Sequence, residues 1–399
     1  MTFFRLCFLL AVGGLPFVST VDADEWSGLV GIEGRYFTQT PQDPRQFDHE
    51  NVSLIVEPEY IHEWDDGRQV FAFVPFLRID QHDSNRTHFD IRELTWEKAE
   101  DAWELRLGVR KVFWGVAEFQ HLVDIINQTD LVENLDTEDK LGQPMANLAL
   151  IQDWGTLDVF VLPFFRERTF AGSEGRPREQ PPVDEDQAGF ESSAEEHHVD
   201  FAIRYSHFIG DWDIGLAHFY GTSRAPRLIP GVDPSGSAVL IPFYDIINQT
   251  SLDVQATKGN MLWKLEALHR SGQANAFNAL AGGFEYTFVG IFETVIDLGI
   301  LGEYHYDDRG ESAPTTLEDD IALGTRLSFN DTQSTEALMG LIVDRESSGK
   351  FFNLEASRRL GENWVVEFQV RAFFGQSRTD PAFTFTRDDY AEMAFFYYF

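Results

Sequence analysis

The sequence predicts an all-β protein, a transmembrane antiparallel up-and-down β-barrel of about 18 strands, with about 16 as the alternative. Three observations predict this fold. Apolar and polar residues alternate along many segments, the connections between segments are short and long in turn, and aromatic residues are abundant, with 36 phenylalanines. Beyond the N-terminal segment, no stretch approaches the ~18 consecutive apolar residues of a membrane-spanning helix, so strands would have to make the crossing.

The alternation is clearest in residues 363–374. Trp364, Val366 and Phe368 fall on one face of this segment, whereas Glu367 and Arg371 fall on the other. Taken along the chain, the pattern predicts strands at 26–38, 50–62, 69–80, 87–98, 102–112, 145–152, 156–166, 198–208, 212–222, 249–258, 261–271, 277–289, 291–305, 319–330, 334–345, 349–359, 363–375 and 388–399. Most of these segments are long enough to cross a bilayer at a tilt.

The connections alternate in length. Short ones, rich in Gly, Asn and Asp, are expected at 64–68, 99–101, 153–155, 209–211, 258–260, 289–290, 331–333 and 361–362, and long ones at 39–49, 113–144, 167–197, 223–248, 306–318 and 376–387. The connections 272–276 and 346–348 are short where the alternation predicts long ones. The segment 237–245 is assigned to a loop, because an additional strand would break the even count. Short turns on one side and long loops on the other are typical of outer-membrane barrels, with both termini on the periplasmic side.

The N-terminus has the pattern of a secretory signal peptide. Residues 1–23 hold Arg5, then an apolar stretch, then a small-residue ending at Ala23. The expected domains are therefore the signal peptide, 1–23, and a single barrel domain, 24–399. Cys7 is the only cysteine, so the exported chain would have no disulfide and no thiolate site.

The net charge is −35, and it does not change when residues 1–23 are removed. Nucleic acid is therefore excluded as a partner, because neutralising phosphates requires a basic surface. The acidity is consistent with solvated acidic loops and also with a pore that weakly prefers cations.

The C-terminus carries the most specific pattern. In the final segment the apolar residues Met393, Phe395, Tyr397 and Phe399 lie two apart, and the chain ends there. This closely resembles the terminal strand of Gram-negative outer-membrane β-barrel proteins, which are often porin-like. The resemblance implies export to the bacterial outer membrane, contact with its lipid and lipopolysaccharide, and recognition by the barrel-assembly machinery. It leaves the oligomeric state unknown.

Charged residues on the inward phase of the strands are candidates for lining a pore. They are Arg35, Glu57, Arg92, Glu104, Arg106, Lys264, Glu266, Arg270, Asp297, Glu303, Arg326, Glu355, Glu367 and Arg371. Mixed charge on a barrel wall can sort ions and small solutes across a transverse field. The alternative is that these side chains pair with one another and stiffen the wall.

The long segment 113–144 is the candidate constriction loop. Its polar residues Asp124, Asn127, Asp130, Glu133 and Asp136 would meet wall arginines if the loop folded into the barrel. The alternative is a cap outside the barrel. This segment resembles part of an uncharacterised Gram-negative barrel family that has a W-G-x-x-E stretch followed by an N-x-x-D stretch. The matching residues are Trp114, Gly115 and Glu118, then Asp124, Asn127 and Asp130. This resemblance covers about thirty residues and bears on the fold more than on the role.

No enzyme is expected, because no G-x-S-x-G motif is present, and His218 and His269 stand alone on their strands. No cofactor or metal is expected either. The acidic connection 167–197 is interpreted as a solvated extracellular loop, although divalent cations could bridge its carboxylates to lipopolysaccharide phosphates. Three functions stay open: a channel for small polar or charged solutes, a non-conducting accessory of an export or assembly system, and a lipid-modifying enzyme.

The hexapeptide DIINQT occurs twice, at 124–129 and 245–250. The flanks of the two copies do not align, so a domain repeat is not indicated. Both copies fall in predicted long connections, and their Ile-Ile pairs would give each loop an apolar anchor at the mouth of the barrel.

Overall fold

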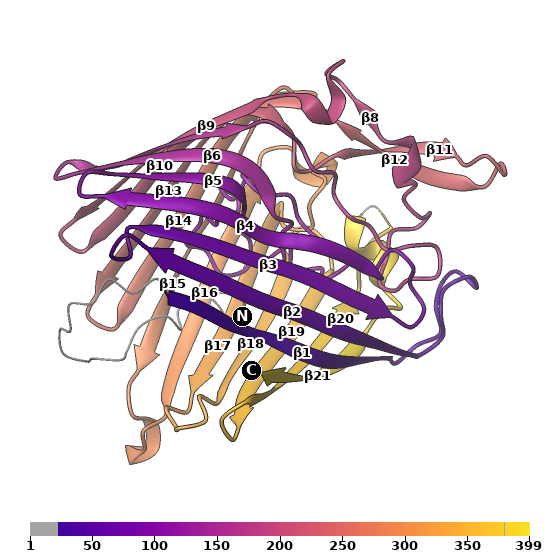
Figure 1. Cartoon of the computed structure of the whole chain (residues 1–399). Coiled ribbons are helices and arrows are strands. Elements are labelled where there is room, and N and C mark those ends of the chain that lie inside the picture. Colours follow the sequence, from indigo (N-terminus) through magenta and orange to yellow (C-terminus); the bar gives the residue numbers. More distant parts are fainter. Residues whose placement is uncertain (1–22, 379) are drawn as a thin grey trace.

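The computed structural model describes residues 23–378 and 380–399, which form a closed antiparallel barrel of 18 strands (Figure 1). The predicted fold class is confirmed, and so is the number of 18 strands. Strands next to each other in the chain pair in the barrel, β7 pairs with β9, β10 pairs with β13, and β1 pairs with β21 to close the ring. The barrel strands are β1 (Ala23–Phe37), β2 (Glu50–Trp64), β3 (Gln69–Asp80), β4 (His88–Glu100), β5 (Trp103–Arg110), β6 (Gln143–Gln152), β7 (Gly155–Leu162), β9 (Asp200–Ile209), β10 (Trp212–Thr222), β13 (Ile246–Lys258), β14 (Met261–Ser271), β15 (Phe277–Phe288), β16 (Asp297–Asp307), β17 (Asp319–Ser328), β18 (Glu336–Asp344), β19 (Lys350–Leu360), β20 (Trp364–Phe374) and β21 (Tyr390–Tyr398).

Alternation along each strand separates an apolar outside from a polar inside. On β1, Ile32 and Tyr36 are exposed on the outer face, whereas Glu33 and Arg35 are buried on the inner face. Leu216 on β10 is another large apolar side chain exposed on the outside. Exposed apolar side chains at every second position are what a lipid-facing barrel wall requires.

Tryptophan marks one end of the barrel. Eight of the nine tryptophans lie in short connections or near strand ends on this side: Trp26, Trp64, Trp96, Trp103, Trp154, Trp212, Trp263 and Trp364. The ninth, Trp114, belongs to the connection 113–144. Because the indole ring prefers the boundary between lipid and water, the short-turn end has the character of a membrane interface.

Within residues 23–378 and 380–399, five short 3-10 helices interrupt the connections: Glu185–Gln187, Glu195–His197, Ile291–Glu293, Gly310–Ser312 and Pro381–Phe385. In the part of the chain that the structure describes, none of the helices is long and apolar enough to cross a membrane. The predicted signal peptide, 1–23, lies outside the described residues except for Ala23, the first residue of β1.

The assignment of 237–245 to a loop is wrong. Ala238–Tyr244 forms strand β12, which pairs with β11 (Arg227–Val232) and β8 (Gly189–Phe190) in a small sheet of its own. The β11–β12 hairpin projects beyond the barrel rim (Figure 1). The segment finds its strand partners inside its own long connections, so it adds a strand to the molecule without changing the barrel count.

Several strand starts differ from the expected ones, and those of β13 and β16 bear on the motifs above. β13 begins at Ile246 rather than at 249, so most of the second DIINQT copy is in a barrel strand. β16 begins at Asp297 rather than at 291. The residues before it form a tight turn in which Phe292 and Glu293 take positive φ angles of 55° and 58°, which end the strand geometry.

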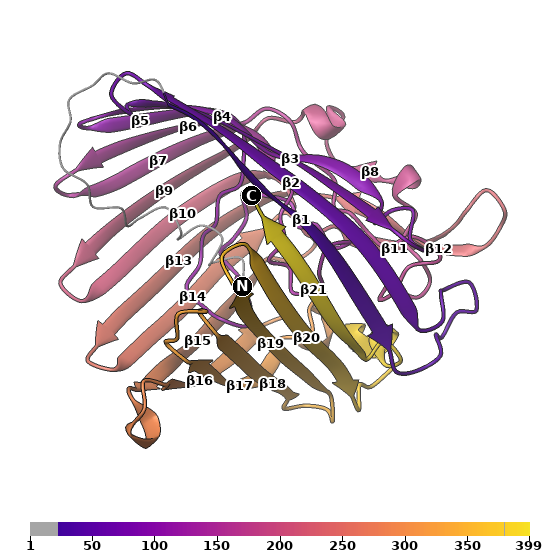
Figure 2. The same ribbon diagram turned by 60° about the horizontal axis from the view of Figure 1, so that its bottom comes forward.

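The long connections fill the opposite end. The connection 113–144 enters the barrel between β5 and β6, and its trace is visible within the ring in Figure 2. Trp114, Ile125 and Ile126 of this connection share one buried apolar cluster with Phe160 and Phe219 of the inner wall. Of the two placements that the sequence left open for this segment, the inward one is observed.

Candidate functional site

The inserted loop is defined here as residues 113–144. One side of it is fixed by Glu118, whose carboxylate accepts hydrogen bonds from Lys264 Nζ on β14 at 3.0 Å and from Arg326 on β17 at 2.6 Å. Next to it, the Phe119 ring lies against Gly324 and Gly340, where an added Cβ would come within 3.1 and 2.7 Å of the ring. The two glycines therefore leave room for the ring against the wall.

Two wall carboxylates hold the backbone of the inserted loop. Glu266 on β14 accepts from the amide nitrogens of Val116, Ala117 and Val123 at 2.6, 2.8 and 3.2 Å. Glu303 on β16 accepts from the amides of residues 118 and 119 at 2.7 and 3.2 Å. Buried amide groups need such acceptors, and a carboxylate makes the stronger bond.

The other side of the inserted loop is fixed by arginines on strands β3, β4 and β20. Arg78 donates to both carboxylate oxygens of Glu133 at 2.6–3.0 Å, and Arg92 donates to Asp130 at 2.7 Å. Arg371 reaches Asp136 at 2.7 Å. The inserted loop therefore contacts the wall on β3, β4 and β20 and also on β14, β16 and β17.

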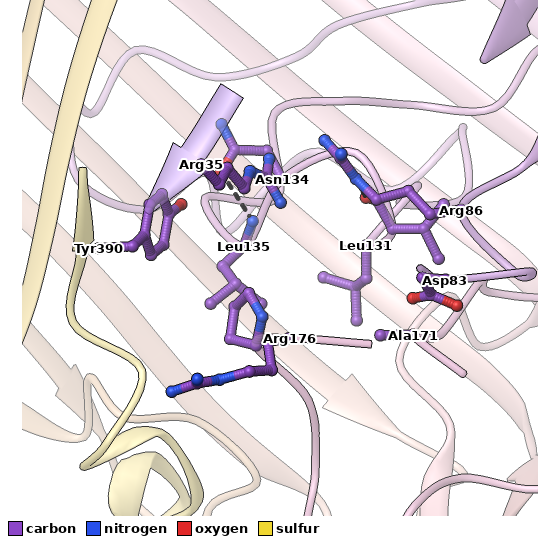
Figure 3. Close-up of a pocket in the computed structure, with 11 residues that line it drawn as sticks. Arg35, Asp83, Arg86, Leu131, Asn134, Leu135, Ala171, Arg176 and Tyr390 are labelled. Atoms are coloured by element: carbon purple, nitrogen blue, oxygen red, sulfur yellow. Dashed lines mark hydrogen bonds between the residues drawn. The ribbon is translucent and has the colours of Figure 1, made fainter. Parts of the chain in front are cut away.

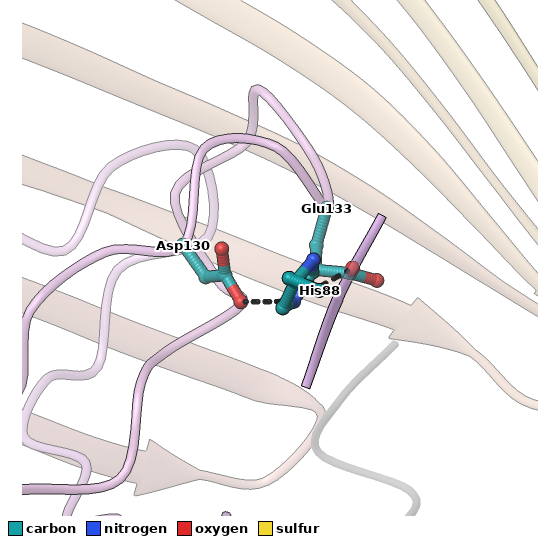
Figure 4. Close-up of side chains that lie close together, drawn as sticks. All are labelled: His88, Asp130 and Glu133. Carbon is teal, nitrogen blue, oxygen red and sulfur yellow. Dashed lines mark ion pairs between the residues drawn. The ribbon is translucent and has the colours of Figure 1, made fainter. Parts of the chain in front are cut away.

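His88, Asp130 and Glu133 lie close enough to suggest a metal site (Figure 4). His88 Nε2 is 3.6 Å from Asp130 Oδ2 and 3.5 Å from Glu133 Oε1. However, Arg92 already occupies Asp130 Oδ2, and Arg78 occupies both oxygens of Glu133. Guanidinium groups on the same oxygens disfavour a second cation, so the trio is better explained as part of the ion-pair network.

The connection 163–199, which includes the predicted loop 167–197, forms a second layer above the inserted loop. Its Arg176 is buried and donates to Asp388 at 2.8 Å and to the carbonyl of Gln39 at 3.1 Å. Arg35, Arg86 and Arg176 line a cavity of about 10 Å³ between the two layers (Figure 3). This is room for about one water molecule, so the layers are closely packed at that point.

Burial and neighbouring charges shift the pKa values of several carboxyl groups in these connections. Burial opposes ionisation of Glu118, but Lys264 and Arg326 overcome it and hold the pKa of Glu118 below its usual value. In the second layer, burial and the neighbouring Glu196 raise the pKa of Glu167 to about 7. Burial likewise raises the pKa of Glu185 to about 7, with Glu167 adding to the effect.

The predicted wall residues fall into three groups. Arg35, Arg92, Glu266, Glu303, Glu355 and Arg371 are buried under the inserted loop or under neighbouring side chains. Half-buried on the inner face are Glu57, Glu104, Arg106, Lys264, Arg270, Arg326 and Glu367. Asp297 lies at the short-turn end, where it accepts from the Gly290 amide at 2.8 Å and from Asn330 at 2.9 Å and so braces a turn.

Of the five predicted loop residues, Asp130, Glu133 and Asp136 reach the wall. The other two brace the base of the loop itself: Asp124 pairs with Lys140 at 3.0 Å, and Asn127 donates to the carbonyls of Arg110 and Leu141. At the C-terminus, Met393, Phe395, Tyr397 and Phe399 are all exposed on the outer face.

Several residues of the network were not predicted. Arg78 donates to Glu33 at 3.0 Å, and Arg86 donates to Glu33 and Asp80 at 2.7 and 2.9 Å. Arg78 and Glu33 lie on the inward phase of their strands, so the alternation could have revealed them. Arg86 and Arg176 lie in irregular connections, where no periodicity marks them.

Comparison with known proteins agrees at the level of the fold. No family model and no curated protein matches the sequence. Wzi, an outer-membrane carbohydrate-binding β-barrel involved in group 1 capsule assembly in Escherichia coli, is 9% identical with a TM-score of 0.52, covering 92% of this chain and 83% of Wzi. A mutant of Rh. blastica porin is 11% identical (TM-score 0.45, covering 94% and 100%), and an OmpT loop-deletion mutant of Vibrio cholerae is 8% identical (TM-score 0.45, covering 95% and 99%).

The closed barrel, its apolar outer wall and its similarity to Wzi define the class. The chain has the fold of an outer-membrane β-barrel protein.

Proposed function

We propose that the protein is a porin-like channel of the bacterial outer membrane, through which small polar or charged solutes diffuse. The observation that carries this proposal is the inserted loop held inside a charged barrel. An 18-stranded barrel is wide enough to enclose an aqueous path. A loop fixed to the inner wall would narrow that path without a change in the wall.

The mechanism follows from the charges around the loop. On one side of the bore, Lys264 and Arg326 face Glu118, and on the other Arg92 faces Asp130. Solutes would pass these paired charges and then the half-buried charged residues nearer the short turns. The local electric field would determine which solutes pass easily. Outer-membrane lipid and lipopolysaccharide would surround the apolar wall, and the barrel-assembly machinery would act on β21.

A second function is favoured by the reach of the inserted loop. Because the loop contacts strands on both sides of the bore, it could close the lumen, and the protein would then be a non-conducting accessory of an export or assembly system. The two proposals differ only in whether water and ions pass the loop.

Single-channel recording in planar bilayers separates them. A channel predicts steps of conductance from the wild-type protein, and deletion of residues 116–140 should then change the size limit for solutes. A plug predicts silence from the wild type and opening on deletion. A wild-type protein that inserts and stays silent would overturn the channel proposal.

A further inference from the structure

Two arginines near the mouth of the barrel pair with none of the acidic residues that the structure describes. Arg168 lies in the connection that follows β7, beside the inserted loop. Arg270 lies on the inner face of β14. Among residues 23–378 and 380–399, no carboxylate lies within the 4.0 Å of an ion pair from either guanidinium. By contrast, Arg78, Arg92 and Arg371 on the same inner surface are all paired.

Neutral glutamines orient these two arginines. Arg168 Nε donates to Gln128 Oε1 at 3.4 Å, and Arg270 donates to Gln249 Oε1 through Nε at 2.8 Å and through a terminal nitrogen at 2.6 Å. Gln128 is 0% exposed and Gln249 is 1% exposed. The two glutamines occupy the same position in the two copies of DIINQT. An amide oxygen directs a guanidinium but leaves its positive charge uncompensated.

A third arginine adds to the charge. Two guanidinium groups lie near one aromatic ring. The guanidinium carbon of Arg309 is 3.4 Å from the centroid of the Phe277 ring, and that of Arg270 is 5.6 Å from it. Arg309 pairs with Asp307 at 2.5–2.8 Å. Arg270 interacts electrostatically with Arg168, Arg309 and Asp307. Three guanidiniums with one carboxylate leave an excess of positive charge at this place, within a chain that is strongly acidic overall.

A donor without an acceptor lies in the same cluster. Gln249 Nε2 is buried and makes no hydrogen bond to any described residue, while the oxygen of the same amide accepts from Arg270. Arg168 and Arg270 are each half-buried as whole residues. Burial lowers the pKa of Arg168 to about 10, which still leaves it charged at neutral pH.

We propose that Arg168, Arg270 and Gln249 form an anion-binding subsite inside the mouth of the barrel, which takes a small solute bearing a carboxylate or phosphate group. Guanidinium forks suit the paired oxygens of such groups, and the free amide of Gln249 supplies one more donor. The subsite faces the lumen, so a free solute can reach it and the headgroup of a lipid on the outer wall cannot. This inference rests on the proposed function, because it names the solute class that the channel would hold.

The test uses the full chain folded in detergent and isothermal titration with inorganic phosphate, then with succinate. The wild type should bind one of the two probes, and the double variant R168Q/R270Q should weaken that binding by about tenfold or more. Gln249→Glu is a second variant that places a carboxylate beside Arg270, so it should abolish binding without leaving a buried charge unpaired. The control is Arg345→Gln, since Arg345 is an exposed arginine paired with Asp319 outside the cluster.

The outcomes for this subsite and for the channel are distinguishable. If the wild type conducts but binds neither phosphate nor succinate, the subsite is overturned and the channel proposal stands. If it binds a probe but never conducts, the subsite stands and the channel proposal falls. Binding that is equal in wild type, R168Q/R270Q and Gln249→Glu would also overturn the subsite.

Discussion

Glu118 ties the inserted loop to two strands, β14 and β17, at once. It accepts from Lys264 and Arg326, and those two cations hold it ionised. A charge-assisted hydrogen bond of this kind contributes about 2 kcal/mol, and its loss leaves two wall cations without their acceptor.

Replacing Glu118 by Gln should therefore loosen the loop near Phe119 while the barrel stays folded. We expect larger and more frequent conductance fluctuations than in the wild type, measured by single-channel recording. Glu311→Gln is the matched control, because Glu311 is exposed in another connection and forms no ion pair with any residue that the structure describes. Identical traces from E118Q and the wild type would contradict the role given to Glu118.

For single residues, the sequence predicts which face of a strand a side chain lies on better than it predicts which group that side chain binds. The alternation places Glu266, Glu303 and Arg371 on the inner face, and they are buried there. The alternation cannot show that Glu266 and Glu303 accept hydrogen bonds from backbone amides of the inserted loop, because every residue type other than proline has a backbone amide group. Each of these hydrogen bonds joins two residues that are about 150 to 185 positions apart in the sequence.

Among the elements, strands were predictable and long connections were not. A strand repeats its pattern every two residues, and so β20 could be placed from its own sequence. β12 was missed because it has strand character but pairs within the connections, outside the barrel. The paths of the inserted loop and of 167–197 are set by single side chains such as Arg176, which no periodicity reveals.

The second layer should respond to pH. Glu167 and Glu185 both have pKa values of about 7, raised above the ordinary value by burial and by neighbouring acids. A carboxyl whose pKa is raised on folding stabilises the packed loop below its ordinary pKa, and that contribution is lost as the pH rises through about 7. We therefore expect 167–197 to loosen as the pH rises from about 6 to about 8.

Hydrogen exchange of the loop amides measures this change. Exchange in 167–197 should become several-fold faster over that pH range, after correction for the intrinsic pH dependence. The double variant E167Q/E185Q should remove most of this difference in exchange rate, because the glutamine side chains do not ionise. A difference that persists in the double variant would show that other groups control the loop.

For the whole molecule, closure of the ring depends on β21. Phe399 exchanges two backbone hydrogen bonds with Gly28 at 3.1 and 3.2 Å, and its side chain is 51% exposed on the outer face. The backbone bonds close the barrel, and we propose that the exposed ring is the part recognised during assembly.

Phe399→Ala keeps those backbone bonds, so the variant should fold in detergent with the thermal stability of the wild type. In cells we expect several-fold less protein in the outer membrane, measured by immunoblotting of membrane fractions. Phe374→Ala is the control, because Phe374 is an outward-facing aromatic residue of similar exposure on another strand. Equal membrane levels of the two variants would contradict a recognition role for Phe399.

The position of the tryptophans gives the molecule a built-in optical marker of its orientation. With eight of the nine indoles at the short-turn end, most of the intrinsic fluorescence arises beside one leaflet. A membrane-impermeant quencher added to only one side of sealed vesicles would therefore dim the emission strongly or weakly according to which way the barrels had inserted. Mixed populations of inserted protein could be counted in this way without any label.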